Sequence, residues 1–334
     1  MKSVASRGWE SGESDAARWV LGIDVGGTGS RAALEPFSPP GAAVGAERRV
    51  LEGGRVGVAS AGSSVVDVAV GLIADARGAW PDAAIVGVGV GATGLASLVG
   101  SPDEAAARLA RAAGAPVALA IDAVTAHLGA LGGRGGAVVA VGTGAIAIGT
   151  DLHDRWKRVG GWGHLFDDRG SGAWIGIEAL KAAIRTHDGV TTDAAALLDA
   201  AVARFGAAPS WPGRLLTRPD RAGLLAGFAA DVAGLAASGD VVASDIMRRA
   251  GAEVAATLAA ALDPEVPPLA AGTGGVFGAG GVFAEAFASE FGRLAPSASL
   301  VAAEGTPLDG AVRLARLPGA GEAPAGHPPF VWRG

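Results

Sequence analysis

The chain has 334 residues, a formal net charge of −6 at neutral pH, 55 glycines, 18 prolines and no cysteine. Its length suggests about two domains of roughly 150 residues each. The absence of cysteine excludes disulfides, iron–sulfur clusters and cysteine-type zinc sites, and an acidic chain without a basic stripe argues against a nucleic-acid partner.

The N-terminal segment carries no secretory signal. Residues 1–17 are polar and lack an apolar core, which predicts a disordered tail. The longest charge-free stretch, residues 83–102, is broken by Gly, Ser and Thr residues and fits a strand and a turn better than a membrane-spanning helix. We therefore expect a cytoplasmic protein that does not associate with membranes.

The first part of the chain alternates between short β-branched runs and longer amphipathic runs, the pattern of an α/β protein. Strands are expected over residues 18–25, 31–35, 47–52, 84–90 and 117–121, and helices over residues 63–80, 102–113 and 123–131. Ser101 to Glu104 form a capping box with Pro102 at the first helical position.

A second cycle of the same pattern starts after the Gly-Gly-Arg-Gly-Gly stretch at 132–136. Strands are expected over 137–141, 145–150, 156–159 and 269–271, and helices over 171–186, most of 193–262, 281–294 and 308–317. The repeat predicts two related α/β domains, residues 18–133 and 134–317, with a cleft between them. The second would carry a helical insertion, its last helix would pack back on the first domain, and residues 318–334 would form a Pro/Gly tail.

The first motif with chemical potential begins at Asp24, at the end of a predicted buried strand. Gly26 and Gly27 follow it and would allow a phosphate to approach the backbone closely. Thr28 and Ser30 would donate hydrogen bonds to that phosphate, and Asp24 would hold a hydrated Mg²⁺. An ordinary glycine hairpin closed by Asp is the alternative for this motif taken alone.

Two more strands run into glycine turns, Gly142-Thr143-Gly144 and Gly274-Gly275. The turn at 142–144 and the hairpin after Asp24, on matching strands and facing each other across a cleft, would clamp a polyphosphate. A plain strand-to-helix turn is the alternative for Gly274-Gly275.

Taken together and in this order, the motifs resemble the N-acetylglucosamine kinase family, sugar kinases of the actin, hexokinase and Hsp70 ATPase superfamily. The similarity extends over about residues 18–317. Its motifs are Asp-x-Gly-Gly-Thr at 24–28, Asp122 after a strand, Gly-Thr-Gly at 142–144, Gly-Gly-Trp-Gly-His at 160–164, Gly-Ser-x-x-Trp-Ile-Gly at 170–176 and Gly-Gly-Val-Phe at 274–277. The resemblance implies two ribonuclease H-like domains around a nucleotide cleft, ATP and Mg²⁺ as cofactors, and the dimeric state common in the family.

The resemblance also implies roles for individual residues. Asp122, which by local sequence alone could be a helix N-cap, would be the base that takes the proton of the sugar 6-hydroxyl as it attacks the γ-phosphate of ATP. The nucleotide would be bound by Gly26, Gly27, Thr28, Ser30, Gly142, Thr143, Gly144, Ala226, Gly274 and Gly275, with Asp24 organising Mg²⁺. The sugar would be bound by Asp122, Ala145, Gly161, Trp162, Gly163 and Asp168.

Three departures from the family pattern concern the sugar. The family has Gly-Asp-Glu-Gly-Ser where this chain has Asp-Asp-Arg-Gly-Ser at 167–171, so Arg169 reverses a charge beside the sugar. The family also places an Asn near Ser60 or Ala61, and Ser-Asn in place of Ala145-Ile146, whereas this chain contains no Asn. The resemblance therefore favours an ATP-dependent amino-sugar kinase, with N-acetylglucosamine as the first candidate substrate and a related hexosamine or muramyl sugar as the alternative.

Other functions fit the sequence less well. Gly89-x-Gly91-x-x-Gly94 imitates a dinucleotide-binding fingerprint, but the next helix starts near Pro102 and no acidic residue follows at about 20 positions. The related activator ATPases of benzoyl-CoA reductases and hydroxyacyl-CoA dehydratases hold a cluster through Cys, and a sugar-sensing regulator would need a DNA-binding segment. A catalytically silent nucleotide- or sugar-binding protein is the remaining alternative, against which Asp122 argues.

Overall fold

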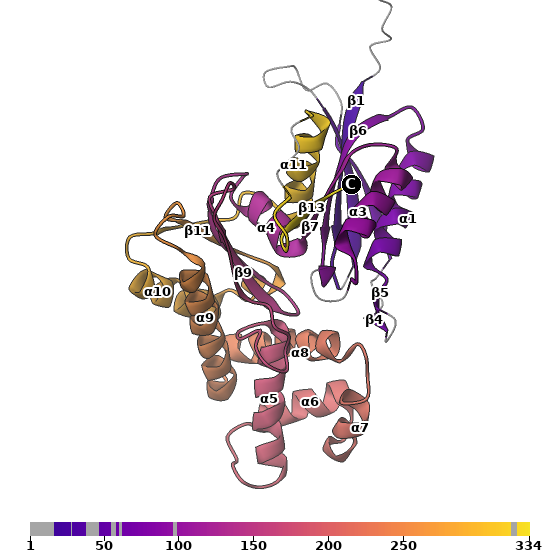
Figure 1. Cartoon of the computed structure of the whole chain (residues 1–334). Helices are drawn as coiled ribbons and strands as arrows, with labels where there is room; N and C mark the ends of the chain where they lie inside the picture. The colour runs from indigo at the N-terminus through magenta and orange to yellow at the C-terminus, as the bar shows by residue number, and fades with distance from the viewer. Residues whose placement is uncertain are drawn as a thin grey trace, which may run out of the picture.

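The computed structural model describes residues 17–27, 29–37, 47–54, 58–59, 62–95, 99–321 and 326–334. Its framework consists of two β-sheets (Figure 1). The first sheet has the order β13 (Val331–Arg333), β7 (Val117–Ile121), β6 (Ala84–Ala92), β1 (Arg18–Val25), β2 (Ser30–Pro36) and β3 (Arg49–Gly53). The second has the order β10 (Trp156–Gly160), β9 (Ala145–Thr150), β8 (Gly136–Val141), β11 (Leu269–Thr273) and β12 (Ser299–Val301). The short strands β4 (Val58–Ala59) and β5 (Gly62–Ser63) pair separately.

The two sheets repeat one topology. In the first, β1 pairs antiparallel with β2 and parallel with β6, which pairs parallel with β7. In the second, β8 pairs antiparallel with β9 and parallel with β11, which pairs parallel with β12. The α/β class and the repeated order of elements predicted from the sequence are thereby confirmed.

Among the described residues, four helices accompany the first sheet. One face packs against α1 (Val65–Ala79) and α3 (Pro102–Ala113), and α11 (Pro307–Gly319) packs across β1 and β6. Helix α4 (Asp122–Ala130) contacts α11, β6 and also β8 of the second sheet, so that α4 lies between the two sheets (Figure 1). The predicted cap of α3 is confirmed, because the Ser101 side chain accepts a hydrogen bond from the Glu104 N–H.

The remaining helices accompany the second sheet (Figure 1). They are α5 (Gly172–His187), α6 (Ala195–Phe205), α7 (Trp211–Leu215), α8 (Arg221–Ala237), α9 (Val241–Ala261) and α10 (Gly281–Leu294), with the short 3₁₀ turns η1 (Ala208–Ser210) and η2 (Gly275–Ala279). Among the residues described, no single helix is long and apolar enough to cross a membrane. Helices α8 and α9, which meet at a bend of 118°, together have the length and apolar composition of a membrane span, but they meet these two criteria only.

Glycines on β1 and β6 allow α11 to lie directly on the sheet. A Cβ on Gly89 would lie 2.2 Å from the carbonyl oxygen of Ala311, and one on Gly22 would lie 2.4 Å from the backbone nitrogen of Val312. A Cβ on Gly91 would lie 2.1 Å from Oγ1 of Thr125 on α4. Helices therefore occupy the space beside Gly89 and Gly91, and the dinucleotide alternative for these residues is excluded.

The expected Pro/Gly tail at 318–334 is wrong for the residues described there. Helix α11 continues to Gly319, and β13 adds an antiparallel edge strand that pairs Val331 with Ala120 of β7. Val331 and Trp332 are buried in the core of the first sheet. Three residues are too short for a recognisable strand pattern, and burial of two large apolar side chains holds them in place. The predicted tail at 1–17 lies outside the described residues except for Ala17.

His127 connects α4 to the start of the second sheet. Its side chain is 1% exposed and its Nε2 lies 3.0 Å from the carbonyl oxygen of Gly136, the first residue of β8. Burial lowers the pKa of His127 to about 4. The imidazole is therefore neutral at neutral pH, with the Nε2–H donating to Gly136.

We expect Gly89→Ala to destabilise the fold by about 1–3 kcal/mol, the usual cost of an extra methyl group in a packed contact. The free energy of unfolding from chemical denaturation measures this. The matched control is Gly71→Ala on the exposed side of α1, where nothing lies within 4 Å of the added atom and alanine should stabilise the helix slightly. Equal stability of Gly89→Ala and the wild type would contradict the close packing of α11.

The contribution of His127 to stability should fall as the pH falls from 6.5 towards 4, because the unfolded state accepts a proton on His127 before the folded state does. The full effect is about 3 kcal/mol for a shift of this size. His127→Gln keeps a donor for Gly136 and removes this titration, so the stability of the wild type relative to this variant should fall as the pH falls from 6.5 towards 4. His153→Gln, at an exposed position, should show no such change relative to the wild type; a similar change there would contradict the assignment.

Candidate functional site

Asp122 is the first residue of α4 and directly follows β7. Thr93, which follows β6, donates a side-chain hydrogen bond to its carboxylate, and the Ala123 N–H donates another. Burial raises the pKa of Asp122, while these hydrogen bonds and the positive charge of Arg158 oppose the increase. The structure thus places Asp122 at a strand end and helix start, as the sequence predicted.

Asp24 lies at the same edge of the first sheet as Asp122. Its strand β1 runs parallel to β6, which runs parallel to β7, so the carboxyl ends of all three strands meet there. Burial and the charge of Asp122 raise the pKa of Asp24 to about 6, and Arg31, its cross-strand partner, lowers it. Two carboxylates that repel each other at this edge form a suitable place for a cation.

The Gly142-Thr143-Gly144 turn is tied to the start of α5. The Gly142 N–H donates to the Gly144 carbonyl at 2.9 Å, and the Gly172 N–H donates to the Gly142 carbonyl at 2.9 Å. The Ala173 N–H donates to the Thr143 carbonyl at 3.2 Å. The turn is partly open to solvent, so its shape is fixed while its outer surface stays free.

Two other predicted nucleotide-binding segments adjoin this turn. A Cβ on Gly172 would lie 3.1 Å both from the Cβ of Ala226 and from the Gly142 carbonyl oxygen. Gly274, at φ +108°, approaches β8 so closely that a Cβ there would lie 2.3 Å from the Val141 carbonyl oxygen, and Gly275 begins η2. The structure therefore brings Gly142, Thr143, Gly144, Ala226, Gly274 and Gly275 together.

Asp168 joins the glycine turn to the loop at 160–170. Its carboxylate accepts hydrogen bonds from the Gly163 N–H at 3.2 Å and from the Ala145 N–H. Burial is the main cause that raises its pKa, and the charge of Asp167 adds to it, while the hydrogen bonds from Gly163 and Ala145 and the charge of Arg158 oppose the increase. Asp168 is 7% exposed and has φ +53°, a conformation that costs a non-glycine residue energy.

The predicted sugar-binding residues Ala145, Gly161, Trp162, Gly163 and Asp168 are thus held in one cluster. Trp162 is 69% exposed, and its ring lies 4.7 Å from the Arg158 guanidinium carbon. Arg169 does not point to this cluster, because its guanidinium pairs with Glu253 of α9 at 3.1 Å. The positive charge of Arg169, which replaces the negative charge of the family's Glu, therefore lies towards α9.

The hairpin after Asp24 supports only part of the predicted phosphate contacts. The Gly26 N–H donates to the Gly29 carbonyl at 3.0 Å, and Gly27 is exposed. Ser30 is buried and its hydroxyl donates to the Gly54 carbonyl at 2.7 Å. This hydrogen bond ties β2 to the residue that follows β3, so the hydroxyl is not directed to a phosphate. Thr28 lies outside the described residues, as do Ser60 and Ala61.

Thr93 and Arg158 are site residues that the sequence analysis missed. Thr93 could have been found from its place just after a strand parallel to the Asp24 strand, since side chains at such ends converge. Arg158 has no comparable signal, because it lies within β10 and its relation to Asp122 depends on how the two sheets face each other.

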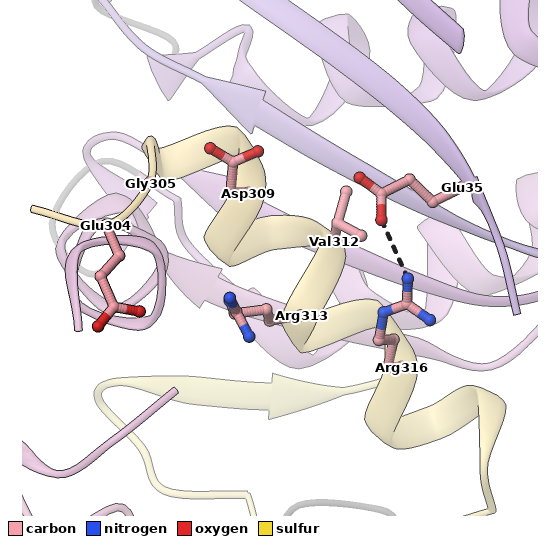
Figure 2. A pocket seen from close by; sticks show the side chains of 7 residues that line it. All are labelled: Glu35, Glu304, Gly305, Asp309, Val312, Arg313 and Arg316. Atoms are coloured by element: carbon pink, nitrogen blue, oxygen red, sulfur yellow. Dashed lines mark hydrogen bonds and ion pairs between the residues drawn. The ribbon is translucent and has the colours of Figure 1, made fainter. Parts of the chain in front are cut away.

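A cavity of about 250 Å³ lies beside α11, away from the candidate site (Figure 2). It is lined by Glu35, Glu304, Gly305, Asp309, Val312, Arg313 and Arg316. Arg316 pairs with Glu35 at 3.0 Å, Arg48 pairs with Asp309, and Arg134 pairs with Glu304. No residue predicted to bind nucleotide or sugar lines this cavity, which is therefore separate from the candidate site. In the parts of the chain that the structure describes, no group of three or more His, Asp or Glu side chains could hold a metal ion.

Comparisons with known proteins agree with this arrangement. Residues 21–315 match the model of the BadF/BadG/BcrA/BcrD ATPase family. The chain belongs to this family. A 67-residue stretch of this chain is 46% identical to the N-acetylmuramic acid/N-acetylglucosamine kinase of Clostridium acetobutylicum. This match spans 20% of this chain and 22% of that relative.

Solved structures extend the likeness to most of the chain. A candidate N-acetylglucosamine kinase from Chromobacterium violaceum is 27% identical, with a TM-score of 0.64 over 90% of this chain and 99% of that one. A ROK family glucokinase from Streptomyces griseus, solved with glucose and AMPPNP, is 18% identical, with a TM-score of 0.59 over 90% of this chain and 98% of that one. The two-domain ATPase fold expected from the resemblance is confirmed.

Asp24→Asn should stabilise the protein above pH 6 and lose that advantage as the pH falls towards 4. The reason is that the folded state holds the Asp24 proton more tightly than the unfolded state, so the contribution of Asp24 to wild-type stability declines as the pH rises through about 6. Thermal unfolding from pH 4 to pH 7.5 measures the difference. Asp199→Asn on the exposed side of α6 is the control, and an Asp24→Asn variant with no pH-dependent gain would contradict the raised pKa.

Proposed function

We propose that this family member is an ATP-dependent kinase that phosphorylates the 6-hydroxyl of an amino sugar, with N-acetylglucosamine as the first candidate. The observation that carries the proposal is the position of Asp122. This carboxylate lies at the edge of the first sheet, and the charge of Arg158 from the second sheet acts on both Asp122 and the loop carboxylate Asp168. One guanidinium on the second sheet is therefore close enough to act on a carboxylate of each half of the chain.

In the proposed reaction the sugar 6-oxygen attacks the γ-phosphorus of ATP while the bond from that phosphorus to the β,γ-bridging oxygen breaks. ADP leaves, and the hydroxyl proton passes to the Asp122 carboxylate. The raised pKa of Asp122 makes it a better proton acceptor than an exposed carboxylate. Thr93 and the Ala123 N–H hold the carboxylate in a fixed orientation while it accepts the proton.

The nucleotide would lie along the glycine turns. Gly142, Thr143 and Gly144 would hold phosphate on the second sheet, with Gly26, Gly27 and Thr28 on the first. The adenine and ribose would lie against Ala226, Gly274 and Gly275. Asp24, supported by the negative charge of Asp122, would hold Mg²⁺ through water, and the ion would neutralise charge on the phosphates.

The sugar would lie at the loop that contains Trp162. Asp122 and Asp168 would accept hydrogen bonds from sugar hydroxyls, while Ala145, Gly161, Trp162 and Gly163 would form the surrounding wall. The names of the similar kinases from Clostridium acetobutylicum and Chromobacterium violaceum support an amino sugar. The absence of Asn from the chain is the reason to keep a related hexosamine or a muramyl sugar as the alternative.

The second candidate is a catalytically silent protein that binds nucleotide or sugar on the same fold. It is favoured by the missing Asn residues and opposed by the ordered hydrogen bonds around Asp122. Turnover separates the two, because a silent protein binds ATP without transferring phosphate.

The test measures ATP-dependent phosphorylation of glucosamine, N-acetylglucosamine, N-acetylmannosamine, N-acetylmuramic acid and glucose. We expect turnover with at least one amino sugar, and a loss of roughly 10²–10⁴ in kcat for Asp122→Asn with nucleotide binding near the wild type. Asp75→Asn, at an exposed position on α1, is the control. Nucleotide binding without turnover on any sugar would favour the silent protein, and full activity of Asp122→Asn would overturn the assignment of the base.

A further inference from the structure

Arg158 makes several contacts at the loop predicted to hold the sugar. It lies in β10, where it pairs with Ile148 of β9. Its Nε donates to the Gly160 carbonyl at 3.1 Å, and its Nη2 donates to the Gly161 carbonyl. Its guanidinium carbon lies 4.7 Å from the centroid of the Trp162 ring. One side chain therefore fixes three consecutive residues of the loop.

The same guanidinium supplies positive charge to a site that is otherwise acidic. The carboxyls here form two repelling pairs, Asp24 with Asp122 and Asp168 with Asp167. The negative charge of Asp24 is partly balanced by the positive charge of Arg31 on the neighbouring strand. Arg158 acts on both Asp122 of α4 and Asp168 of the loop, which belong to different halves of the chain.

We propose that Arg158 is a positioning residue that clamps residues 160–162 of the sugar loop and supplies the positive charge that Asp122 and Asp168 share. This inference rests on the proposed kinase function and adds a residue to it. The clamp uses directed hydrogen bonds from the planar guanidinium, which lysine cannot reproduce. The shared charge needs only a cation at this position, which lysine can supply.

Trp162 gives the clamp a consequence for binding. The guanidinium lies over the ring, yet the side chain remains 69% exposed, so Arg158 holds the indole in one orientation and leaves ring surface for a ligand. A ring already fixed in place loses less conformational entropy when a sugar binds. Loss of the clamp should therefore weaken sugar binding before it affects nucleotide binding.

Arg169 is the natural comparison. It belongs to the same loop region and carries the same charge, but it is exposed and pairs with Glu253. None of Asp24, Asp122 and Asp168 has Arg169 among the groups that shift its pKa. Replacing Arg169 removes one positive charge from the protein without disturbing the carboxylates of the site.

The charge of Arg158 should be visible in the pH dependence of the reaction. Asp122 faces Asp24 from β1, Thr93 from the end of β6 and Arg158 from β10, and Asp168 faces Asp167 and Arg158. Removing the positive charge takes away one of the groups that favour ionisation of Asp122 and leaves the hydrogen bonds from Thr93 and the Ala123 N–H, so its pKa should rise. A base must be unprotonated to act, so the acid limb of kcat/KM should move to higher pH.

The experiment compares Arg158→Lys, Arg158→Gln and Arg169→Gln in the full chain, with the sugar that the wild type phosphorylates. Both Arg158 variants should raise the KM for sugar by roughly tenfold to a hundredfold, as expected for a lost charge-assisted hydrogen bond. Arg158→Gln should also move the acid limb to higher pH, while Arg158→Lys should keep it in place. Arg169→Gln should change neither quantity. The inference would be overturned if all three variants had the same KM for sugar and the same pH profile. It would also be overturned if both Arg158 variants raised the KM equally and neither moved the acid limb.

A second measurement keeps the clamp testable without turnover. Amide hydrogen exchange at residues 160–163 should be faster in Arg158→Gln than in the wild type and unchanged in Arg169→Gln. If the wild type phosphorylates no sugar, the proposed function fails, and the exchange data still decide whether Arg158 holds the loop. Unchanged exchange in Arg158→Gln would overturn the clamp even in an active kinase.

Discussion

The close contact between α4 and α11 is the constraint on which the site depends. A Cβ on Gly310 would lie 1.8 Å from the Thr125 carbonyl oxygen, and one on Gly129 would lie 2.0 Å from the Thr306 carbonyl oxygen. The helices touch backbone to backbone, and α11 in turn rests on β1 and β6. Because Asp122 is the first residue of α4, this packing sets how far the carboxylate extends towards the second sheet. Some of the glycines of the chain therefore serve helix packing, a role distinct from the ligand approach proposed for those in the turns.

The same helix pair also lies where the chain crosses between the sheets. The connection from α4 to β8 and the connection from β12 to α11 run side by side, since the Glu304 N–H donates to the Ala130 carbonyl at 2.9 Å and Arg134 pairs with Glu304. His127 adds the contact with Gly136. Movement of one sheet relative to the other would have to pass through these two connections, so they are where a domain closure of the kind seen in other enzymes would be accommodated.

The local sequence was sufficient to predict the position of residues that directly follow a recognisable strand. Asp122 and the Gly142–Gly144 turn each follow a strand directly, and both were placed correctly in the fold. Ser30 was misjudged as a phosphate donor because its hydroxyl partner, Gly54, comes from a different strand connection. β13 was missed because its partner β7 lies about 200 residues earlier. Arg158 was missed because its role depends on the packing of the two sheets, which no local pattern records.

The geometry of the loop also sharpens what the unusual residues mean for specificity. Arg169 looked like a reversal of charge beside the sugar, but its ion pair with Glu253 directs that charge to α9. In the proposed site, the part of the loop that would face the sugar is then defined by Asp168, by Arg158 and by the exposed apolar side chains of Trp162, Leu165 and Phe166. An apolar surface beside hydroxyl acceptors suits a sugar that carries a small apolar group, such as the methyl of an N-acetyl substituent. The amino-sugar substrate that we propose is therefore compatible with the absence of Asn, because the Trp162 ring would offer such a group an apolar contact.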